Sequence, residues 1–203
     1  MKLYYKPGAC SLASHIALYE TGAMFEIEAV DTDLGRTATG DDFRSISPNG
    51  YVPALRLDDG AVLTEGAAVL QYIADRHPKA GLAPEAGTLD RARLHETLNW
   101  VSTELHKAFG PLFRVTCTGK EKTDARDAVA AKFDRVEVQL SDGRDWLVAD
   151  RFSVADAYLF AVANWANFTD IDLSRWPHLA ALVSRVASRP AVRQAMKAEG
   201  LMQ

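Results

Sequence analysis

A change in the hydrophobic pattern at residues 78–88 divides the sequence into two unlike parts. Before this segment, short apolar runs that favour strands alternate with helical patterns, and beyond it strand patterns nearly vanish. The segment has two prolines, two glycines and no apolar period, which is typical of a linker between domains. The sequence therefore predicts one domain at 1–77 and a second at 89–203.

The first part carries the element order of a small mixed sheet. The expected elements are a strand at 3–5, a helix at 11–21, a strand at 25–30, a short helix at 41–46, strands at 52–57 and 61–63, and a helix at 66–76. Asp58-Asp59-Gly60 joins the last two strands, and so short a connection requires them to be antiparallel. This βαβαββα order is the pattern of a thioredoxin-like domain.

The second part is expected to be all-helical. Its helices are predicted at 89–115, 124–140, 153–167, 177–187 and 190–198. The helix at 153–167 is very apolar, so we expect it at the centre of this domain. Ser153-Val154-Ala155-Asp156 precedes it as a capping box, to which we assign a structural role and no catalytic one.

Composition excludes several classes of function. The chain is 48% hydrophobic, and its net charge of −4 is spread over both signs without a basic run, so we expect no nucleic-acid partner. No apolar leader begins the chain and no window approaches the roughly 18 to 20 apolar residues of a membrane span, so we expect a cytoplasmic protein with no membrane partner. Cys10 and Cys117 lie far apart and no Cys/His cluster has ligand spacing, so we expect no metal.

Cys10 lies between the first strand and the first helix, directly after Pro7-Gly8-Ala9. The free N–H groups and the dipole of a helix start favour an anion, so a thiol placed there is expected to ionise readily. The alternative is a small buried apolar residue, which a free cysteine often is.

Two further segments of the first domain could bind a ligand. A proline that opens a strand after a loop, as Pro53 does, is compatible with a cis bond, which would leave the Val52 backbone free to pair with an extended peptide; otherwise it is an ordinary edge proline. Thr64-Glu65-Gly66 marks a strand-to-helix transition, where free N–H groups suit a carboxylate and Glu65 suits an ammonium group. It could equally be a plain helix start.

In the second domain, Asn99, Thr103 and His106 recur at helical spacing, followed by Lys107. Such a polar stripe is commonly the solvated side of a bundle helix. If it faces the first domain instead, it closes a polar cleft over Cys10.

Together these segments resemble the glutathione transferase family, most closely its bacterial beta class, and the resemblance covers the whole chain. Its carriers are the segments at 1–18, 49–55, 63–66, 99–107 and 153–160. The resemblance implies a thioredoxin-like domain joined to an all-helical one, and a homodimer. It also implies conjugation of the co-substrate glutathione to small hydrophobic electrophiles, as in detoxification.

By this resemblance, Cys10 lies beside the glutathione sulfur and His106 contacts the same thiol region, so these two are the candidate catalytic residues. Val52, before a cis Pro53, would pair with the cysteinyl backbone, and Glu65 with Gly66 would hold the γ-glutamyl end. The remaining residues expected to line the site are Ala9, Asn99, Thr103, Glu104 and Leu105.

One position departs from the family pattern. The beta class has a lysine near position 35 that reaches the glycyl carboxylate, whereas this chain has Gly35 followed by Arg36. Either Arg36 makes that contact, which we favour because a guanidinium pairs well with a carboxylate, or glutathione binds more weakly.

The chemistry of the electrophile stays open. Phe109, Phe113, Trp165 and Phe168 could form an apolar pocket or could be plain core. Cys10 could act beside the glutathione sulfur or covalently, so thiol–disulfide exchange, peroxidase and dehalogenase side activities stay open. A protein that only binds apolar ligands is the non-enzymatic alternative.

Overall fold

The computed structural model describes residues 1–202 and divides into two compact units. The first unit consists of Met1–Ala83 together with the C-terminal segment that begins at Ser188. The second unit is Pro84–Ala187. Each unit has its own core.

The first unit contains a five-stranded mixed sheet with the order β3-β2-β1-β4-β5. Its strands are β1 (Lys2–Tyr5), β2 (Glu26–Asp31), β3 (Arg36–Thr37), β4 (Ala54–Arg56) and β5 (Val62–Thr64). β1 runs parallel to β2, with Leu3 opposite Ile27, and antiparallel to β4, with Leu3 opposite Leu55. The hairpin predicted at Asp58-Asp59-Gly60 joins β4 and β5, which are antiparallel.

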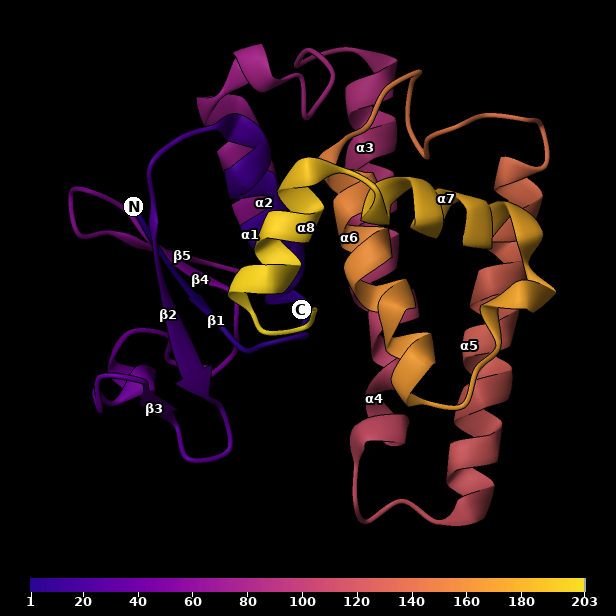
Figure 1. Cartoon of the computed structure of the whole chain (residues 1–203), viewed down its shortest axis with the longest axis horizontal. Coiled ribbons are helices and arrows are strands. Elements are labelled where there is room, and N and C mark those ends of the chain that lie inside the picture. Colours follow the sequence, from indigo (N-terminus) through magenta and orange to yellow (C-terminus); the bar gives the residue numbers. More distant parts are fainter. Residues whose placement is uncertain (203) are drawn as a thin grey trace. The chain divides into compact units, whose positions relative to one another are not determined.

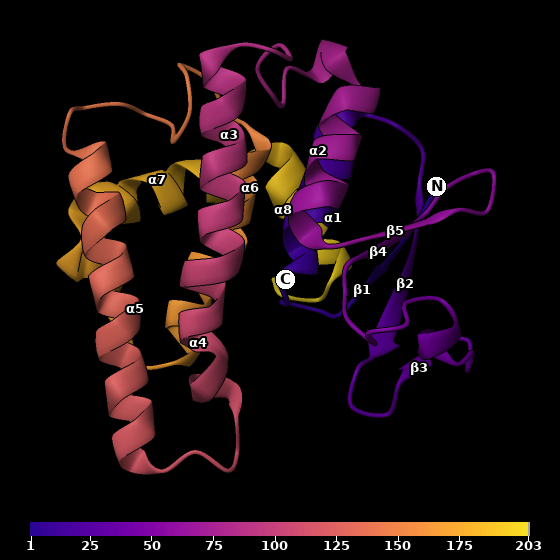
Figure 2. The same ribbon diagram turned by 180° about the vertical axis from the view of Figure 1, so that it is seen from behind.

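Helices α1 (Ser11–Thr21) and α2 (Gly66–Arg76) cover one face of this sheet, and α8 (Pro190–Ala198) packs against α1. Figures 1 and 2 show them side by side, with α8 against α1. Every residue from Ser11 to Leu18 is buried, because α1 has neighbours on several sides. Gly22 ends α1 in the left-handed conformation with φ 68°, which a residue without a Cβ adopts at no steric cost.

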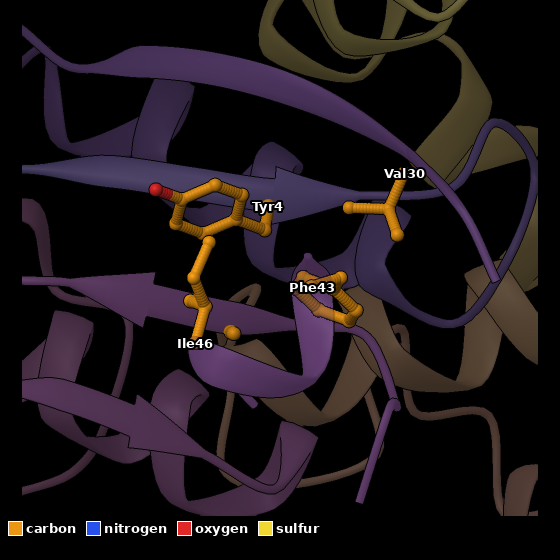
Figure 3. Packing of buried hydrophobic residues seen from close by; sticks show 5 residues of the cluster. Tyr4, Val30, Phe43 and Ile46 are labelled. Carbon is orange, nitrogen blue, oxygen red and sulfur yellow. The ribbon is translucent and has the colours of Figure 1, made fainter. Parts of the chain in front are cut away.

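An apolar cluster covers the opposite face. Successive side chains of a strand point to opposite faces, so Tyr4 points away from α1 while Tyr5 packs against His15 of that helix. Figure 3 shows Tyr4 beside Val30, Phe43 and Ile46. Phe43 belongs to a single 3₁₀ turn, Phe43–Ser45, where the sequence predicts a short helix at 41–46.

The second unit is all-helical, as predicted. Its helices are α3 (Leu89–Trp100), α4 (His106–Phe113), α5 (Gly119–Leu140), α6 (Val154–Ala163) and α7 (Pro177–Ala187). Within residues 1–202, four 3₁₀ turns lie outside the long helices of the two units, at Phe43–Ser45, Pro78–Ala80, Asn164–Phe168 and Leu173–Arg175. No helix of the described residues is long and apolar enough to cross a membrane.

The core of the second unit is built around α6, all of whose residues are buried, as expected for so apolar a helix. Helix α5 contributes the buried stripe Val129, Phe133, Val136 and Leu140. The capping box at the start of α6 is present, with the Ser153 N–H donating to the Asp156 carboxylate at 2.8 Å. Asp156 also accepts from the Leu147 N–H at 2.9 Å, so the structural role assigned to this box is a tie between a loop and the central helix.

Helix α8 differs from the expected division of the chain. Its position in the sequence groups it with the helical part at 89–203, but its buried face packs against α1 and places it in the first unit. Arg189, just before α8, donates two hydrogen bonds to the Glu20 carboxylate of α1, at 2.6 and 2.8 Å. The first unit is therefore built from both ends of the chain.

Candidate functional site

The sheet topology brings three of the predicted segments to one edge. β1 ends at Tyr5, and the chain leaves it toward Cys10. Because β4 is antiparallel to β1 and β5 antiparallel to β4, the start of β4 and the end of β5 meet that same edge, with Tyr4 opposite Ala54 and Ala54 opposite Thr64. Cys10, Val52 and Glu65 are consequently neighbours around one end of the sheet.

Cys10 and Val52 are in direct contact. The Cys10 thiol donates to the Val52 carbonyl oxygen at an Sγ–O distance of 3.5 Å. Gly8 has φ 71° and turns the chain between β1 and α1, and the Ala9 N–H donates back to the Lys6 carbonyl at 3.0 Å. The Val52–Pro53 peptide bond is cis. Among the described residues, no acceptor is found for the Val52 N–H, which is the donor that an extended peptide would use.

The protonation of Cys10 differs from expectation. Burial raises the pKa of this thiol to about 12, and the nearby Glu65 carboxylate raises it further. The backbone N–H groups of Cys10 and Ser11 at the start of α1 lower the pKa, as the sequence predicts, but desolvation outweighs them. The prediction that Cys10 ionises readily is therefore wrong, and Cys10 is a neutral hydrogen-bond donor at pH 7.

Glu65 is held in a strained backbone conformation, with φ 67° and ψ 113°. Such a geometry at a residue with a Cβ costs of order 1–3 kcal/mol and is characteristic of functional sites. Glu65 directly precedes α2, and among the described residues the N–H groups of Gly66, Ala67 and Ala68 find no acceptor. An anionic carboxylate therefore fits the start of α2, with the Glu65 carboxylate beside it to accept from an ammonium group.

Arg36 lies at the same end of the sheet but on β3, the edge strand opposite β5. It is paired with Asp31 where β3 meets β2, and its guanidinium donates to the Gly40 carbonyl at 3.1 Å. Gly35 before it has φ 66°, a conformation that lysine adopts only under strain. A lysine at position 35 would therefore be strained in this loop.

Sequence reasoning missed the buried support of the Cys10 loop. Glu199, which follows α8, accepts from the Gly8 N–H at 2.9 Å, and its other oxygen pairs with Nδ1 of His15 at 2.9 Å. Both side chains of the Glu199–His15 pair are fully buried. No local pattern could have indicated this contact, since it joins residues separated by 191 positions.

In the second unit, a π turn at Val101–Leu105 separates α3 from α4 and ends at His106. The backbone N–H of His106 donates to the Val101 carbonyl, five residues back instead of the four of an α-helix. This wider hydrogen bond shows that the turn contains one extra residue. His106 packs edge-on to Trp165 with ring centroids 4.9 Å apart, and its Nδ1 lies 3.4 Å from the Tyr158 hydroxyl. Burial, with a smaller contribution from the Lys107 charge, lowers the pKa of His106 to about 4, so its ring is neutral at pH 7.

The other predicted residues of this helix fall into two groups. Asn99, Thr103 and Glu104 are exposed, with the Thr103 hydroxyl donating to the Asn99 carbonyl at 3.0 Å and Glu104 paired to Lys132 at 2.6 Å. Leu105 is fully buried, so its side chain belongs to the core and cannot contact a ligand at the surface. The inserted residue of the π turn also breaks the regular spacing on which the stripe Asn99, Thr103, His106 was based.

Of the four aromatic residues that could form a pocket or be plain core, two are core and two are exposed. Phe109 and Trp165 are buried and stack edge to face at 5.5 Å, whereas Phe113 and Phe168 are 51% and 68% exposed. Phe113 packs against the Trp165 ring at 5.3 Å. The second unit therefore offers exposed aromatic surface next to His106 and its Trp165 neighbour.

A groove of about 410 Å³ lies elsewhere in the second unit, between α3 and α5. It is lined by polar and apolar side chains in equal number, among them Arg93, Glu96, Trp100 and Arg135. Neither Cys10 nor His106 lines it. Among residues 1–202, no group of three or more His, Cys, Asp and Glu side chains gathers at metal-binding distance.

The site of the first unit therefore offers hydrogen-bonding groups to each part of a small peptide. It presents backbone donors for a peptide at Val52 and for a carboxylate at Gly66, an acceptor for an ammonium group at Glu65, and a neutral thiol donor at Cys10. This set matches an extended peptide with a free α-amino acid end and a sulfur atom in the middle.

Comparison with known proteins agrees with this geometry. The glutathione S-transferase N-terminal domain model matches residues 1–75, and the C-terminal domain model matches residues 100–190. The chain is 46% identical over 201 residues to glutathione S-transferase GstA of Escherichia coli O157:H7, covering 99% of this chain and all of that protein. A bacterial beta class glutathione S-transferase of Sphingomonas chungbukensis superposes with a TM-score of 0.96 at 48% identity, each chain being covered in full. A sphingomonad glutathione S-transferase solved with glutathione gives a TM-score of 0.96 at 47% identity, again with both chains covered completely. The chain thus belongs to the glutathione S-transferase family and has the fold of its bacterial beta class.

Proposed function

We propose that this enzyme transfers the thiolate of glutathione to small apolar electrophiles, with Cys10 as a hydrogen-bond donor beside the glutathione sulfur. The observation that carries this proposal is the contact of the Cys10 thiol with the Val52 carbonyl, 3.5 Å apart, at the edge where Glu65 and the start of α2 also lie. The S–H proton of glutathione is lost to solvent, a C–S bond forms, and the leaving group of the electrophile departs.

Each part of the tripeptide has a candidate partner in the first unit. The γ-glutamyl carboxylate accepts from the N–H groups of Gly66 and Ala67, and the ammonium group donates to Glu65. The cysteinyl backbone pairs in extended conformation with the Val52 backbone, just before β4 begins. Pro53 and Ala9 flank this path.

Arg36 is proposed for the glycyl carboxylate. Neighbouring strands lie about 4.8 Å apart, so β3 is about 10 Å from β1, whereas one residue of an extended peptide spans about 3.5 Å. Arg36 must therefore leave the Gly40 carbonyl and extend along the sheet edge to make this contact. Replacing it with Ala should raise the KM for glutathione and leave kcat nearly unchanged, and an unchanged KM would remove Arg36 from the site.

The second unit is proposed to supply His106, Asn99, Thr103 and Glu104 to the same ligand through their polar atoms. Phe113 and Phe168, the exposed aromatic residues of this unit, are proposed to contact the apolar electrophile. Leu105 is left out because it is buried.

The protonated state of Cys10 supports the transfer reaction over thiol–disulfide exchange. With its pKa raised to about 12, the Cys10 thiol is protonated at pH 7, whereas the thiolate is the attacking form in exchange. A neutral Cys10 can still donate to a glutathione thiolate and stabilise it. Serine keeps an O–H donor at this position, so Cys10→Ser should retain more transfer activity than Cys10→Ala.

The test uses binding and two activities. The purified protein should be retained on immobilised glutathione and eluted by free glutathione, and it should release chloride from 1-chloro-2,4-dinitrobenzene. Cys10→Ala should lower this transfer activity without abolishing it. Cys117→Ala is the matched control, since it removes the other half-buried thiol of the chain, and it should behave as the wild type.

Two outcomes would contradict parts of the proposal. The first is that the wild type reduces a mixed disulfide such as hydroxyethyl disulfide–glutathione quickly and Cys10→Ala does not reduce it at all. Cys10 would then act covalently, and the protein would be a thiol–disulfide oxidoreductase. If the protein binds glutathione or apolar dyes tightly and turns over no electrophile, it is a binding protein.

The working unit is proposed to be a homodimer located in the cytoplasm. The support is the resemblance of the whole chain to its family, together with a charge of −4 and only two cysteines, which need no oxidising compartment. Light scattering after size exclusion should give twice the 22.2 kDa mass of the chain. A mass of 22.2 kDa at micromolar concentration would rule the dimer out.

A further inference from the structure

His106 is held by three features that belong to the second unit alone. The π turn at Val101–Leu105 ends at this residue and sets the direction of its side chain. The edge-on packing against Trp165, at 75° between ring planes, limits rotation of the imidazole. Its Nδ1 faces the hydroxyl of Tyr158, a residue of the central helix α6 that is only 2% exposed.

We propose that Tyr158 is a positioning residue for His106: its hydroxyl donates to Nδ1 and thereby keeps the ring in the tautomer that carries its proton on Nε2. Only the contact of Nε2 with the glutathione sulfur rests on the proposed function. Both residues belong to the second unit, Tyr158 to α6 and His106 to the start of α4.

The direction of this hydrogen bond follows from the chemistry of the two groups. A neutral imidazole has one N–H donor and one bare nitrogen, and the hydrogen bond made by one nitrogen decides which of the two carries the proton. A phenol O–H is a stronger donor than an imidazole N–H, and a bare imidazole nitrogen is a stronger acceptor than a phenol oxygen. The pairing of Tyr158 O–H with bare Nδ1 is therefore the favoured one, and the proton of the ring resides on Nε2.

The consequence concerns the role of His106. Because the pKa of His106 is lowered to about 4 by burial and by Lys107, the ring does not take up a proton from a thiol at pH 7. With its proton on Nε2, it instead offers an N–H donor. A neutral donor stabilises an adjacent sulfur anion without a net charge of its own.

The test reads the tautomer directly. In the ¹⁵N spectrum of His106, the wild type should show a protonated Nε2 and a bare Nδ1 at pH 7. Tyr158→Phe keeps the ring packed in the core and removes only the hydroxyl, so it should give an averaged pair of signals from both tautomers. Tyr72→Phe removes one hydroxyl from half-buried Tyr72 of α2 and should leave the His106 signals unchanged.

Activity gives a second readout. Loss of one ordinary hydrogen bond corresponds to about a fivefold change in rate, so Tyr158→Phe should lower kcat about fivefold and shift the pH–rate profile for the bound thiol upward, with the KM for glutathione little changed. Tyr72→Phe should show neither effect.

The inference and the proposed function fail in different ways. If His106 carries its proton on Nδ1, or if Tyr158→Phe leaves the His106 signals identical to wild type, Tyr158 does not set the tautomer and the inference is overturned. If the tautomer responds as expected while glutathione neither binds in calorimetry nor reacts, the inference stands and the proposed function fails.

Discussion

The buried carboxylate of Glu199 is expected to be one of the most sensitive positions in the first unit. It accepts from the Gly8 N–H and pairs with His15, each at 2.9 Å, and both partners depend on it inside the protein. The other ring nitrogen of His15, Nε2, is buried and has no hydrogen-bond partner among the described residues. The contact with Glu199 is therefore the hydrogen bond on which the His15 ring depends. We therefore consider the replacement Glu199→Ala.

The magnitude follows from the bonds that are lost. A hydrogen bond to a charged group contributes about 1.5–3 kcal/mol, and removing one member of a buried pair costs about 3–5 kcal/mol. Glu199→Ala should therefore lower the free energy of unfolding by about 3–5 kcal/mol, a large part of the 5–15 kcal/mol that is typical of a domain. Glu199→Gln keeps an acceptor for the Gly8 N–H and should lose about half as much.

The position of the tryptophans allows the loss to be located. Trp100, Trp146, Trp165 and Trp176 all belong to the second unit, so their fluorescence reports on that unit alone. Cys10 reports on the first unit, if its reaction with a thiol reagent is followed in a Cys117→Ala background.

In urea, Glu199→Ala should expose Cys10 at concentrations where the tryptophan fluorescence is still native. Gln194→Ala, an exposed change on the same helix α8, serves as the control and should stay within about 0.5 kcal/mol of the wild type. A Glu199→Ala midpoint equal to that of Gln194→Ala would refute the reasoning, and so would loss of the tryptophan signal before Cys10 reacts.

Three further changes test the packing and the electrostatics. Burial raises the pKa of Glu28, but hydrogen bonds, above all from Thr39, lower it in sum from 4.5 to about 2. Because the pKa of Glu28 is lower in the folded state, its ionised form stabilises the fold by about 3 kcal/mol above pH 4.5, and this stabilisation is lost as pH falls toward 2. Glu28→Gln removes this titration and should flatten a plot of the urea midpoint against pH between 7 and 3. Asp156→Ala removes the carboxylate that accepts from the Leu147 and Ser153 N–H groups, and it should lower the free energy of unfolding by about 3–5 kcal/mol. Urea unfolding followed by tryptophan fluorescence measures this change, and an unchanged midpoint would mean that the capping box has no structural role. Phe133→Ala opens a cavity beside the core of the second unit and should cost about 3–5 kcal/mol in the same assay; a cost under 1 kcal/mol would show that this core collapses around the gap.

The helices were predictable wherever apolar spacing and a boundary residue agree. The ranges 11–21 and 66–76 are predicted at the bounds of α1 and α2, and 177–187 and 190–198 at those of α7 and α8. Gly22 and the prolines at 177 and 190 mark these ends. The predicted helix at 124–140 begins five residues earlier in the structure, because Thr118 and Glu121 form a capping box that starts the helix at Gly119.

Elements that depend on distant partners escaped prediction. β3 has two residues and exists only because Arg36 and Thr37 pair with the end of β2. The inserted residue of the π turn before His106 leaves no mark in the apolar spacing. The destination of α8 depends on its fit against α1, which is a property of the folded first unit.

The site was predictable to the extent that topology determines it. The Asp-Gly turn requires β4 and β5 to be antiparallel, which brings Val52 and Glu65 together, and the antiparallel pairing of β4 with β1 places both at the end of the sheet where Cys10 lies. The pKa of Cys10 depends instead on how closely the folded protein surrounds the thiol, which the position at a helix start does not reveal. The support from Glu199 and the contact of Tyr158 with His106 require the tertiary structure for the same reason.

The return of the C-terminal segment to the first unit orders events during synthesis. The ribosome completes Met1–Ala83 early, but α8 and Glu199 emerge only after the whole second unit has been made. At about 5–20 residues per second, the remaining stretch takes roughly 6–24 s. During that interval α1 lacks its α8 neighbour, so the unit that is translated first is the unit that is completed last.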